Sequence, residues 1–312
     1  MSSLSYIAII ADPASRHISL GIGEAAMMCG AFIGTLTNGP IIDNWGLDVL
    51  GYINVGINVI TGMVVICLVP EIYKETADKY SWREVLKPHH ILDTFKCIFR
   101  PRPGKRRLFL NMSLTVYCTL FMTVQVTTSV GFLYFVKEEG MSLTTYSLFN
   151  SFAFMSKAIS MFVLWLSKKM QLDKLDMAII FSGLHTGAYI LLSVNGGGVS
   201  ALQWIAIALM GGHLAVFAVL RNIQVSLVDQ DETGKLFAYD AIIQLLCFTV
   251  LSIGINLIYG WSVAFWPEFI FSVSSLVGLI SLAVMVSLIL MIQRNDNIIV
   301  HHKEHTDAKP IQ

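Results

Sequence analysis

The sequence predicts an all-α protein that crosses a membrane many times, as a multi-pass transmembrane helix bundle. Hydrophobic residues make up 55% of its 312 residues and charged residues only 13%, whereas a soluble domain carries roughly 25% charged residues. The apolar residues gather into stretches of ~20 residues, the length that crosses a bilayer core. The net charge is zero, so the composition gives no sign of nucleic-acid binding.

Eight spans can be placed along the chain, and each is long enough to cross with modest tilt. They cover residues 20–42, 49–69, 108–136, 146–167, 176–194, 201–220, 236–260 and 268–292. The short apolar stretch before the first span is typical of the end of a longer helix. Within the first span, the small residues Gly30, Gly34 and Gly39 predict close packing against a neighbouring helix; a hinge is the alternative.

The basic residues are distributed unevenly over the loops. Nineteen of the 21 Lys and Arg residues fall in alternate connections, together with both chain ends, and only Lys137 falls in the others. Because basic loops stay in the cytoplasm, both termini are expected there. The plasma membrane or a lysosomal membrane would suit such a protein.

One long connection, residues 70–107, divides the chain. It carries ten basic residues, and its apolar positions Ile91, Leu92, Phe95, Ile98 and Phe99 share one face of a short helix. Such a segment is expected to lie along the inner leaflet, although a partner-binding site is an alternative. The expected units are a first part (1–69), this linker, a six-helix bundle (108–292) and a tail (293–312).

The stretch from Arg221 to Asp240 reads as a short polar loop between two spans, with these two charges at its edges. Its Asp231 and Lys235, with Glu232 between them, repeat the acid-to-base spacing of Asp12 and Arg16 near the start of the chain. Repeated halves in one membrane chain are typical of transporters. We therefore expect these five charged residues to lie in loops that move during transport.

Ionisable side chains inside spans are costly and mark functional sites. They comprise Glu24, Lys157, His185, His213 and Asp240, with Arg221 at a span end. His213 and Arg221 are eight residues apart, about 12 Å along one helix face. These residues predict a positively biased cavity in the second half, suited to an anionic solute that moves with protons. The alternatives are hydrogen-bonded core histidines, an Arg221 that only reaches the headgroups, and a Glu24 that pairs with a loop base.

Catalytic and nucleotide-binding signatures are missing from the sequence. It contains no His-Glu-x-x-His, no Gly-x-Ser-x-Gly and no Walker phosphate loop. We therefore expect neither an enzyme nor a cofactor or metal site, and an ion gradient as the energy source.

Two stretches resemble a known family. The first runs from Ser5 to Arg16 and on to Gly23-Glu24-Ala25-Ala26; the second comprises Leu220-Arg221, Ser226 to Val228 and Glu232 to Phe237. They resemble the major facilitator superfamily, and within it the proton-coupled folate transporter family (solute carrier family 46). The likeness covers essentially the whole chain, from the end of the family's fourth helix onward.

The resemblance implies two six-helix bundles that rock around a central site, of which this chain lacks the first three helices and most of the fourth. It implies proton coupling at Glu24, and binding of substrate and proton at Arg221. The cargo would be a folate-like or conjugated organic anion. The eighth helix of the family can carry a histidine, whereas residues 152–157 here contain none. The alternative is a shortened carrier that transports nothing and acts as a regulatory or receptor-like partner.

Overall fold

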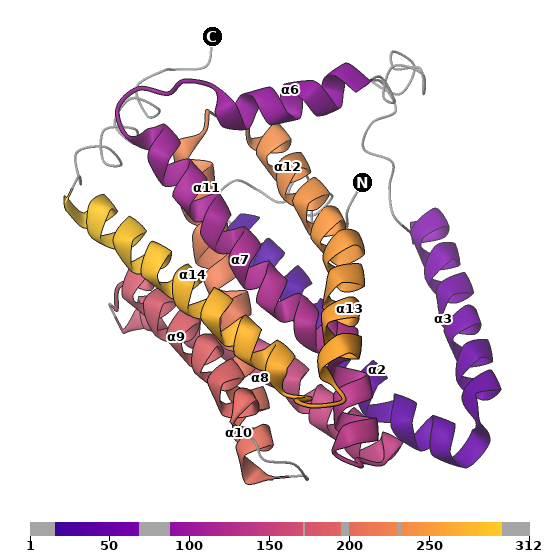
Figure 1. The fold of residues 1–312 in the computed structure, drawn as a ribbon. Coiled ribbons are helices and arrows are strands. Elements are labelled where there is room, and N and C mark those ends of the chain that lie inside the picture. Colours follow the sequence, from indigo (N-terminus) through magenta and orange to yellow (C-terminus); the bar gives the residue numbers. More distant parts are fainter. Residues whose placement is uncertain (1–15, 69–87, 171, 195–199, 230–231, 295–312) are drawn as a thin grey trace.

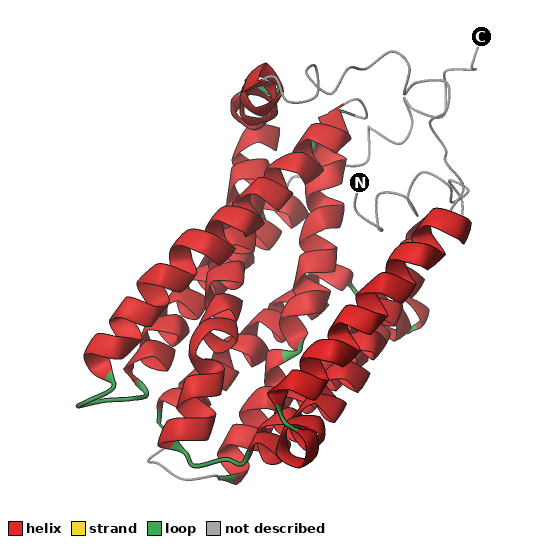
Figure 2. Ribbon diagram, turned by 90° about the vertical axis from the view of Figure 1, so that its right-hand side faces the viewer, coloured by secondary structure: helices red, strands yellow, loops and turns green. Residues whose placement is uncertain are grey.

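The computed structural model describes residues 16–68, 88–170, 172–194, 200–229 and 232–294. All regular elements within these ranges are helices (Figure 2), which confirms the all-α prediction. Seven of them are long and apolar enough to cross a membrane, judged by length and composition. Apart from the span Leu47–Cys67, which stands away from the others, they lie side by side as a bundle, with one shorter helix across one end (Figure 1).

The eight predicted spans are all helical in the structure, most of them a few residues longer than expected. The first four spans and the linker give α2 (Arg16–Trp45), α3 (Leu47–Leu68), α6 (Pro88–Phe99), α7 (Arg106–Leu133) with a π-helical turn η1 (Tyr134–Glu138), and α8 (Leu143–Lys169). The last four give α9 (Lys174–Ser193), α10 (Ala201–Met210), α11 (Gly212–Leu227), α12 (Thr233–Leu246), η3 (Cys247–Leu251), α13 (Ser252–Ser262) and α14 (Phe269–Arg294).

The predicted polar loop between Arg221 and Asp240 is much shorter in the structure. Helix α11 runs on to Leu227 and α12 begins at Thr233, so both charged residues lie inside helices and not at loop edges. The reason is visible in the burial pattern, because Ile223, Gln224 and Leu227 are buried and continue the inward face of α11. Polar residues between these positions hid the periodicity in the sequence.

Helix α2 is the one predicted span outside the seven apolar helices, although its 30 residues are long enough to cross. It packs against α8, where the hydroxyls of Thr35 and Ser151 lie 3.0 Å apart. A side chain at Gly39 would collide with Ser147 of α8, so this glycine permits the close approach that the sequence predicts. No described atom lies within 4 Å of the Cβ position at Gly30 or Gly34, so a packing role for these two stays a prediction.

The core lies among α7, α9, α11 and α14. Phe109, Leu110, Leu120, Leu220 and Leu288 are fully buried there and form one apolar cluster. A second cluster surrounds Tyr134 and Phe135 at the opposite end of α7. Helix α7 is therefore packed along most of its length, which fixes the side chains that face α11 and α12.

The linker helix predicted from residues 91–99 is α6, and it lies across the ends of α7 and α12 (Figure 1). Ile98 is buried and Phe95 packs edge-on against Tyr239 of α12, with ring centroids 5.4 Å apart. Leu92 and Phe99, expected on the same buried face, are 58% and 56% exposed. Helix α6 thus presents apolar side chains to the bundle and also to its surroundings.

Candidate functional site

A cluster of polar side chains joins α7, α11 and α12 inside the bundle. The Tyr117 hydroxyl on α7 accepts a hydrogen bond from Arg221 Nη2 of α11 at 3.5 Å and a second one from the Gln244 amide of α12. Asp240 lies one turn before Gln244 and interacts electrostatically with Arg221. We call Tyr117, Arg221, Asp240 and Gln244 the arginine cluster.

The Asp240 carboxyl is buried, with only 4% of the residue exposed, and neither of its oxygens has a hydrogen-bond partner among the described residues. A buried carboxylate without partners is costly. The charge of Arg221 offsets this cost in part, and a bound proton or a hydrogen-bond donor of a ligand would offset the rest. This unsatisfied carboxyl is the feature that makes the cluster a candidate binding site.

The arrangement follows from helical spacing on α11. His213, Phe217 and Arg221 are four residues apart and therefore occupy one face, as the sequence predicts for His213 and Arg221. The Phe217 ring packs on both neighbours, with centroid distances of 5.6 Å to His213 and 4.8 Å to Tyr117. This column of side chains connects the arginine cluster with a second polar cluster deeper in the bundle.

The second cluster contains His185 and His213, which the sequence predicted as separate candidates and not as a pair. The rings of His185 on α9 and His213 on α11 are 5.1 Å apart, and both residues are buried. Their Nδ1 atoms lie 3.0 Å and 2.7 Å from the carbonyl oxygen of Met210. Because a carbonyl only accepts, both Nδ1 atoms carry a proton and donate it there.

His185 has a further partner at its other ring nitrogen, since Nε2 lies 2.9 Å from the Thr123 hydroxyl. That hydroxyl also lies 2.7 Å from the Leu120 carbonyl, to which it can donate. A neutral His185 accepts the hydroxyl proton at Nε2. A protonated His185 donates to the hydroxyl oxygen, and the hydroxyl then donates to Leu120. The cluster can hence take up one proton by turning a hydroxyl, without moving heavy atoms.

The histidines meet at a break in a membrane span. Helix α10 ends at Met210 and α11 begins at Gly212, which interrupts the regular helical hydrogen bonding, although the Leu214 amide still donates to the Gly211 carbonyl at 3.3 Å. Ser156 of α8 donates to the Ala208 carbonyl, and Ser160 donates to the Gly211 carbonyl at 3.0 Å. A side chain at Gly211 would collide with the α8 backbone. The break lies at Met-Gly-Gly-His, and the paired glycines are the signal that our continuous span 201–220 overlooked.

Lys157 of α8 belongs to the same region. Its Nζ lies 4.3 Å from the centroid of the Phe154 ring, a cation–π contact. Its charge interacts with both His185 and His213. The structure therefore brings together three of the predicted residues, and it links them through Phe217 to two more, Arg221 and Asp240.

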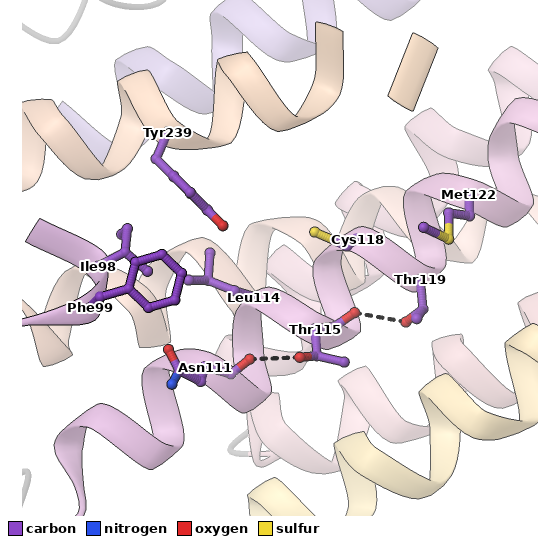
Figure 3. A pocket seen from close by; sticks show the side chains of 9 residues that line it. All are labelled: Ile98, Phe99, Asn111, Leu114, Thr115, Cys118, Thr119, Met122 and Tyr239. Carbon is purple, nitrogen blue, oxygen red and sulfur yellow. Dashed lines mark hydrogen bonds between the residues drawn. The ribbon is translucent and has the colours of Figure 1, made fainter. Parts of the chain in front are cut away.

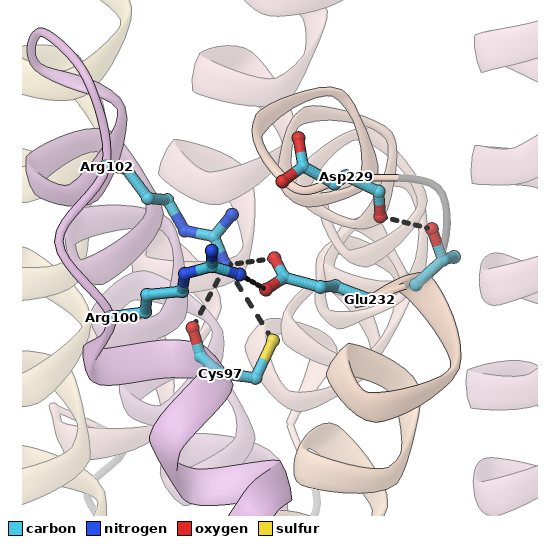
Figure 4. A network of polar contacts seen from close by, with 6 residues as sticks. Cys97, Arg100, Arg102, Asp229 and Glu232 are labelled. Carbon is cyan, nitrogen blue, oxygen red and sulfur yellow. Dashed lines mark hydrogen bonds and ion pairs between the residues drawn. The ribbon is translucent and has the colours of Figure 1, made fainter.

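Of the charged residues that were predicted to lie in moving loops, those that the structure describes are not part of these two polar clusters. Glu232 directly precedes α12, and its carboxylate pairs with Arg100 at 3.1 Å and with Arg102 at 2.8 Å, as Figure 4 shows. Arg102 also donates to the Cys97 carbonyl. The α6–α7 connection is thereby tied to the start of α12. Lys235 is exposed on α12, and Asp12 and Asp231 lie outside the described residues, as do the side chains of Arg16 and Glu24.

Electrostatics support a permanent charge at Glu232. Burial alone would raise the pKa of its carboxyl, but hydrogen bonds and charges from Arg102 and Arg100 outweigh burial and hold that pKa below its usual range. Burial, with the neighbouring Glu232 charge, raises the pKa of the Cys97 thiol. The ion pair therefore keeps its charges at neutral pH while the adjacent thiol stays protonated.

Two residues of the site escaped sequence reasoning, namely Tyr117 and Thr123. Both lie in an apolar span, where a single hydroxyl is commonplace. Only the packing of α7 against its neighbouring helices shows that their hydroxyls meet Arg221 and His185. Gln224 lies one turn after Arg221, is fully buried, and has no hydrogen-bond partner for its amide among the described residues.

Comparison with known proteins assigns the chain to a family. The model of the Major Facilitator Superfamily matches residues 1–250, most of the chain. The chain has no match among curated proteins. Among solved structures it is similar to the peptide transporter POT, crystallised as a glutamate-to-glutamine mutant in complex with sulfate. The TM-score is 0.55 at 14% sequence identity, covering 91% of this chain and 71% of that one. Family and fold point to a transporter and not to an enzyme: the chain belongs to the major facilitator superfamily.

Proposed function

We propose that this protein moves a small organic anion across the membrane together with a proton. The observation that carries the proposal is the arginine cluster, in which a cation on α11 faces a buried, unsatisfied carboxyl on α12. A guanidinium is the group best suited to bind a carboxylate or phosphate. The cargo is a folate-like or otherwise conjugated anion, as the resemblance to the proton-coupled folate transporter family suggests.

Proton coupling follows from charge balance at Arg221. With Asp240 ionised, the two charges offset each other, and an incoming anion would meet the Asp240 charge as well as the guanidinium. With Asp240 protonated, the attraction between Asp240 and Arg221 is weaker, and the guanidinium interacts more favourably with an incoming anion. The proton and the anion therefore favour each other's binding, which is the thermodynamic requirement for cotransport.

The histidine cluster supplies a second place for a proton. His185 can be protonated at Nε2 while its Nδ1 bond to Met210 stays in place. The charge of Lys157 also acts on both histidines. We assign His185 and His213 to proton movement, and Lys157 to the positive potential that attracts the anion.

The alternating access expected of the family needs one bundle to move relative to the other. The α2–α8 contact is described packing between the first part of the chain and the six-helix part, and it includes the Thr35–Ser151 hydroxyl pair and the close approach at Gly39. The break at Gly211 gives α10 and α11 a place to bend relative to each other. Glu24 on α2 is assigned to proton coupling on the basis of the resemblance alone.

The test is uptake of labelled folate-like and conjugated anions at mildly acidic outside pH, with both termini expected in the cytoplasm of a plasma-membrane protein. We expect Arg221→Ala to lower uptake to background and Glu24→Gln to reduce it strongly. Arg294→Ala, an exposed arginine at the far end of α14, serves as control and should retain uptake. Normal uptake with both Arg221→Ala and Glu24→Gln made would overturn the site assignment.

A second candidate function is a membrane partner that regulates a carrier without transporting. Helix α3 favours it, because Asn54 and Asn58 are exposed on an otherwise apolar span. Carboxamides in such positions commonly bond to another membrane helix. Flux by the purified chain alone would exclude this role, whereas co-purification with a full-length carrier and no flux would support it.

A further inference from the structure

A groove of about 370 Å³ opens between α6, α7 and α12, away from the arginine cluster's own hydrogen bonds (Figure 3). Its wall includes Phe99 of α6, Tyr239 of α12, and Leu114, Thr115, Cys118 and Met122 of α7. The positions on α7 extend over about three turns from Asn111 to Met122, or about 16 Å. The groove is therefore long and narrow, and it follows the direction of a membrane span.

The polar residues of the groove wall present few polar groups to its interior. The Thr115 hydroxyl donates to the Asn111 carbonyl at 2.9 Å, and the Thr119 hydroxyl donates to the Thr115 carbonyl at 2.9 Å (Figure 3). Since these hydroxyls are occupied by their own helix, their methyl groups are left for contact. With Leu114 and Met122, this makes a surface suited to a hydrocarbon chain.

One end of the groove is basic. Arg107, Asn111 and Thr115 are four residues apart on α7 and therefore share a face, so the exposed Arg107 lies beyond the Asn111 end. Arg100 directly follows Phe99, and its side chain is 65% exposed although it pairs with Glu232. The stretch from 100 to 107 contains five basic residues and no acidic one. A ligand with an apolar chain and a negative end would match both parts.

The side chains of α6 indicate at which depth of the membrane the basic end of the groove lies. Leu92 and Phe99 are largely exposed although Phe99 also lines the groove, and the exposed Lys96 lies between them in the sequence. A helix that exposes apolar and basic side chains together is typical of the boundary between headgroups and acyl chains. The groove consequently opens at the level where a lipid phosphate would lie.

We propose that this groove binds an anionic glycerophospholipid from the leaflet on which α6 lies. One acyl chain occupies the groove between α7 and α12, and the phosphate with its headgroup contacts Arg107 and the neighbouring bases. The bound lipid fills the space beneath α6 and ties this helix to the bundle. The site does not depend on the identity of the transported solute.

The test uses the purified full chain in detergent, with dioleoyl phosphatidylserine or dioleoyl phosphatidylcholine added as probe. Thermal unfolding and a binding titration are measured for each lipid. We expect phosphatidylserine to raise the melting temperature more than phosphatidylcholine does and to bind more tightly. A ligand that binds only the folded form stabilises it by mass action, so the two readouts should agree.

Two pairs of variants distinguish the contact with the acyl chain of the lipid from the contact with its headgroup. Thr115→Trp fills the groove from an exposed position, while Thr128→Trp places the same bulk on an exposed threonine of α7 outside the groove. Thr115→Trp should abolish the stabilisation by both lipids, and Thr128→Trp should leave it intact. Arg107→Gln should weaken phosphatidylserine binding about fivefold, the effect of one base at an anionic surface; Arg294→Gln should not.

Three outcomes would overturn the proposal. Equal stabilisation by the two lipids would show that the groove does not prefer an anionic headgroup. Full stabilisation of Thr115→Trp would place the lipid elsewhere. Equal stabilisation by glycerophosphoserine, which has no acyl chains, would show that a soluble anion suffices and that the groove is not used.

Discussion

The hydroxyl of Tyr117 and the guanidinium of Arg221 lie 3.5 Å apart, although 104 residues separate them in the chain. The same hydroxyl accepts a hydrogen bond from Gln244, so Tyr117 joins three helices at one oxygen. This contact places the Arg221 side chain beside α7 and near Asp240. This favours a functional arginine over one that only reaches the membrane surface.

Tyr117→Phe tests this arrangement. The ring packing on Phe217 is retained and the hydroxyl is lost, so stability should change little while the position of Arg221 loosens. Loss of a hydrogen bond to a charged group costs about 1.5 kcal/mol or more, which predicts an apparent affinity for the anion about tenfold weaker. Uptake measured against anion concentration gives the value. Tyr146→Phe, which removes a hydroxyl outside the cluster, should behave as the unmodified protein; an equal loss in both would contradict the assignment.

The break in the span 201–227 predicts a specific intolerance at Gly211. A Cβ there would collide with the α8 backbone at Ser156 and Lys157. We expect Gly211→Ala to lower stability by about 1–3 kcal/mol, as overpacking does, and to slow transport. Gly187→Ala is the matched control, because no described atom lies within 4 Å of a Cβ at that half-buried position of α9. The measurement is thermal unfolding of both variants in detergent. Equal melting temperatures would contradict the tight contact between Gly211 and α8.

The Glu232 ion pair predicts a pH dependence of stability. The folded-state pKa of this carboxyl is lowered, so its stabilising contribution is complete above the unfolded-state value of about 4.3 and is lost as pH falls through the folded-state value. Glu232→Gln should therefore lower the melting temperature at neutral pH, by the equivalent of about 1–3 kcal/mol. The difference between the two proteins should shrink below about pH 4.

The control for this prediction is Asp229→Asn in the same loop, since Asp229 is exposed and contacts the loop through its backbone carbonyl. Its melting temperature should follow that of the unmodified protein at each pH. A Glu232→Gln difference that persists unchanged into acid would mean that packing, and not the ion pair, accounts for the loss.

Much of the fold could be predicted from the sequence, because a membrane span can be recognised by the length and hydropathy of its apolar stretch. All eight spans and the linker helix α6 appear as helices in the structure. The ends were less well predicted. The polar residues Asn222, Gln224 and Ser226 suggested a loop after Arg221, yet the buried positions between them keep α11 helical to Leu227.

The candidate site was predicted only as single residues. Spacing along one helix correctly placed His213 and Arg221 on one face. Contacts between helices follow from packing, so the meeting of His185 with His213, and of Arg221 with Tyr117, could not be foreseen. The Gly-Gly pair in the middle of a span was the one overlooked signal, and it marks the place where the Met210 carbonyl becomes available to both histidines.

Asp240→Asn tests the central claim most directly, since asparagine imitates the protonated acid at all pH values. The measurement is exchange of labelled anion across proteoliposomes at neutral and at mildly acidic pH. If proton binding to Asp240 makes Arg221 more available to the anion, the variant should exchange anion at neutral pH as fast as the unmodified protein does at acidic pH. A proton gradient should no longer drive the variant to accumulate the anion. Exchange by Asp240→Asn that keeps the pH dependence of the unmodified protein would contradict the coupling of Arg221 and Asp240.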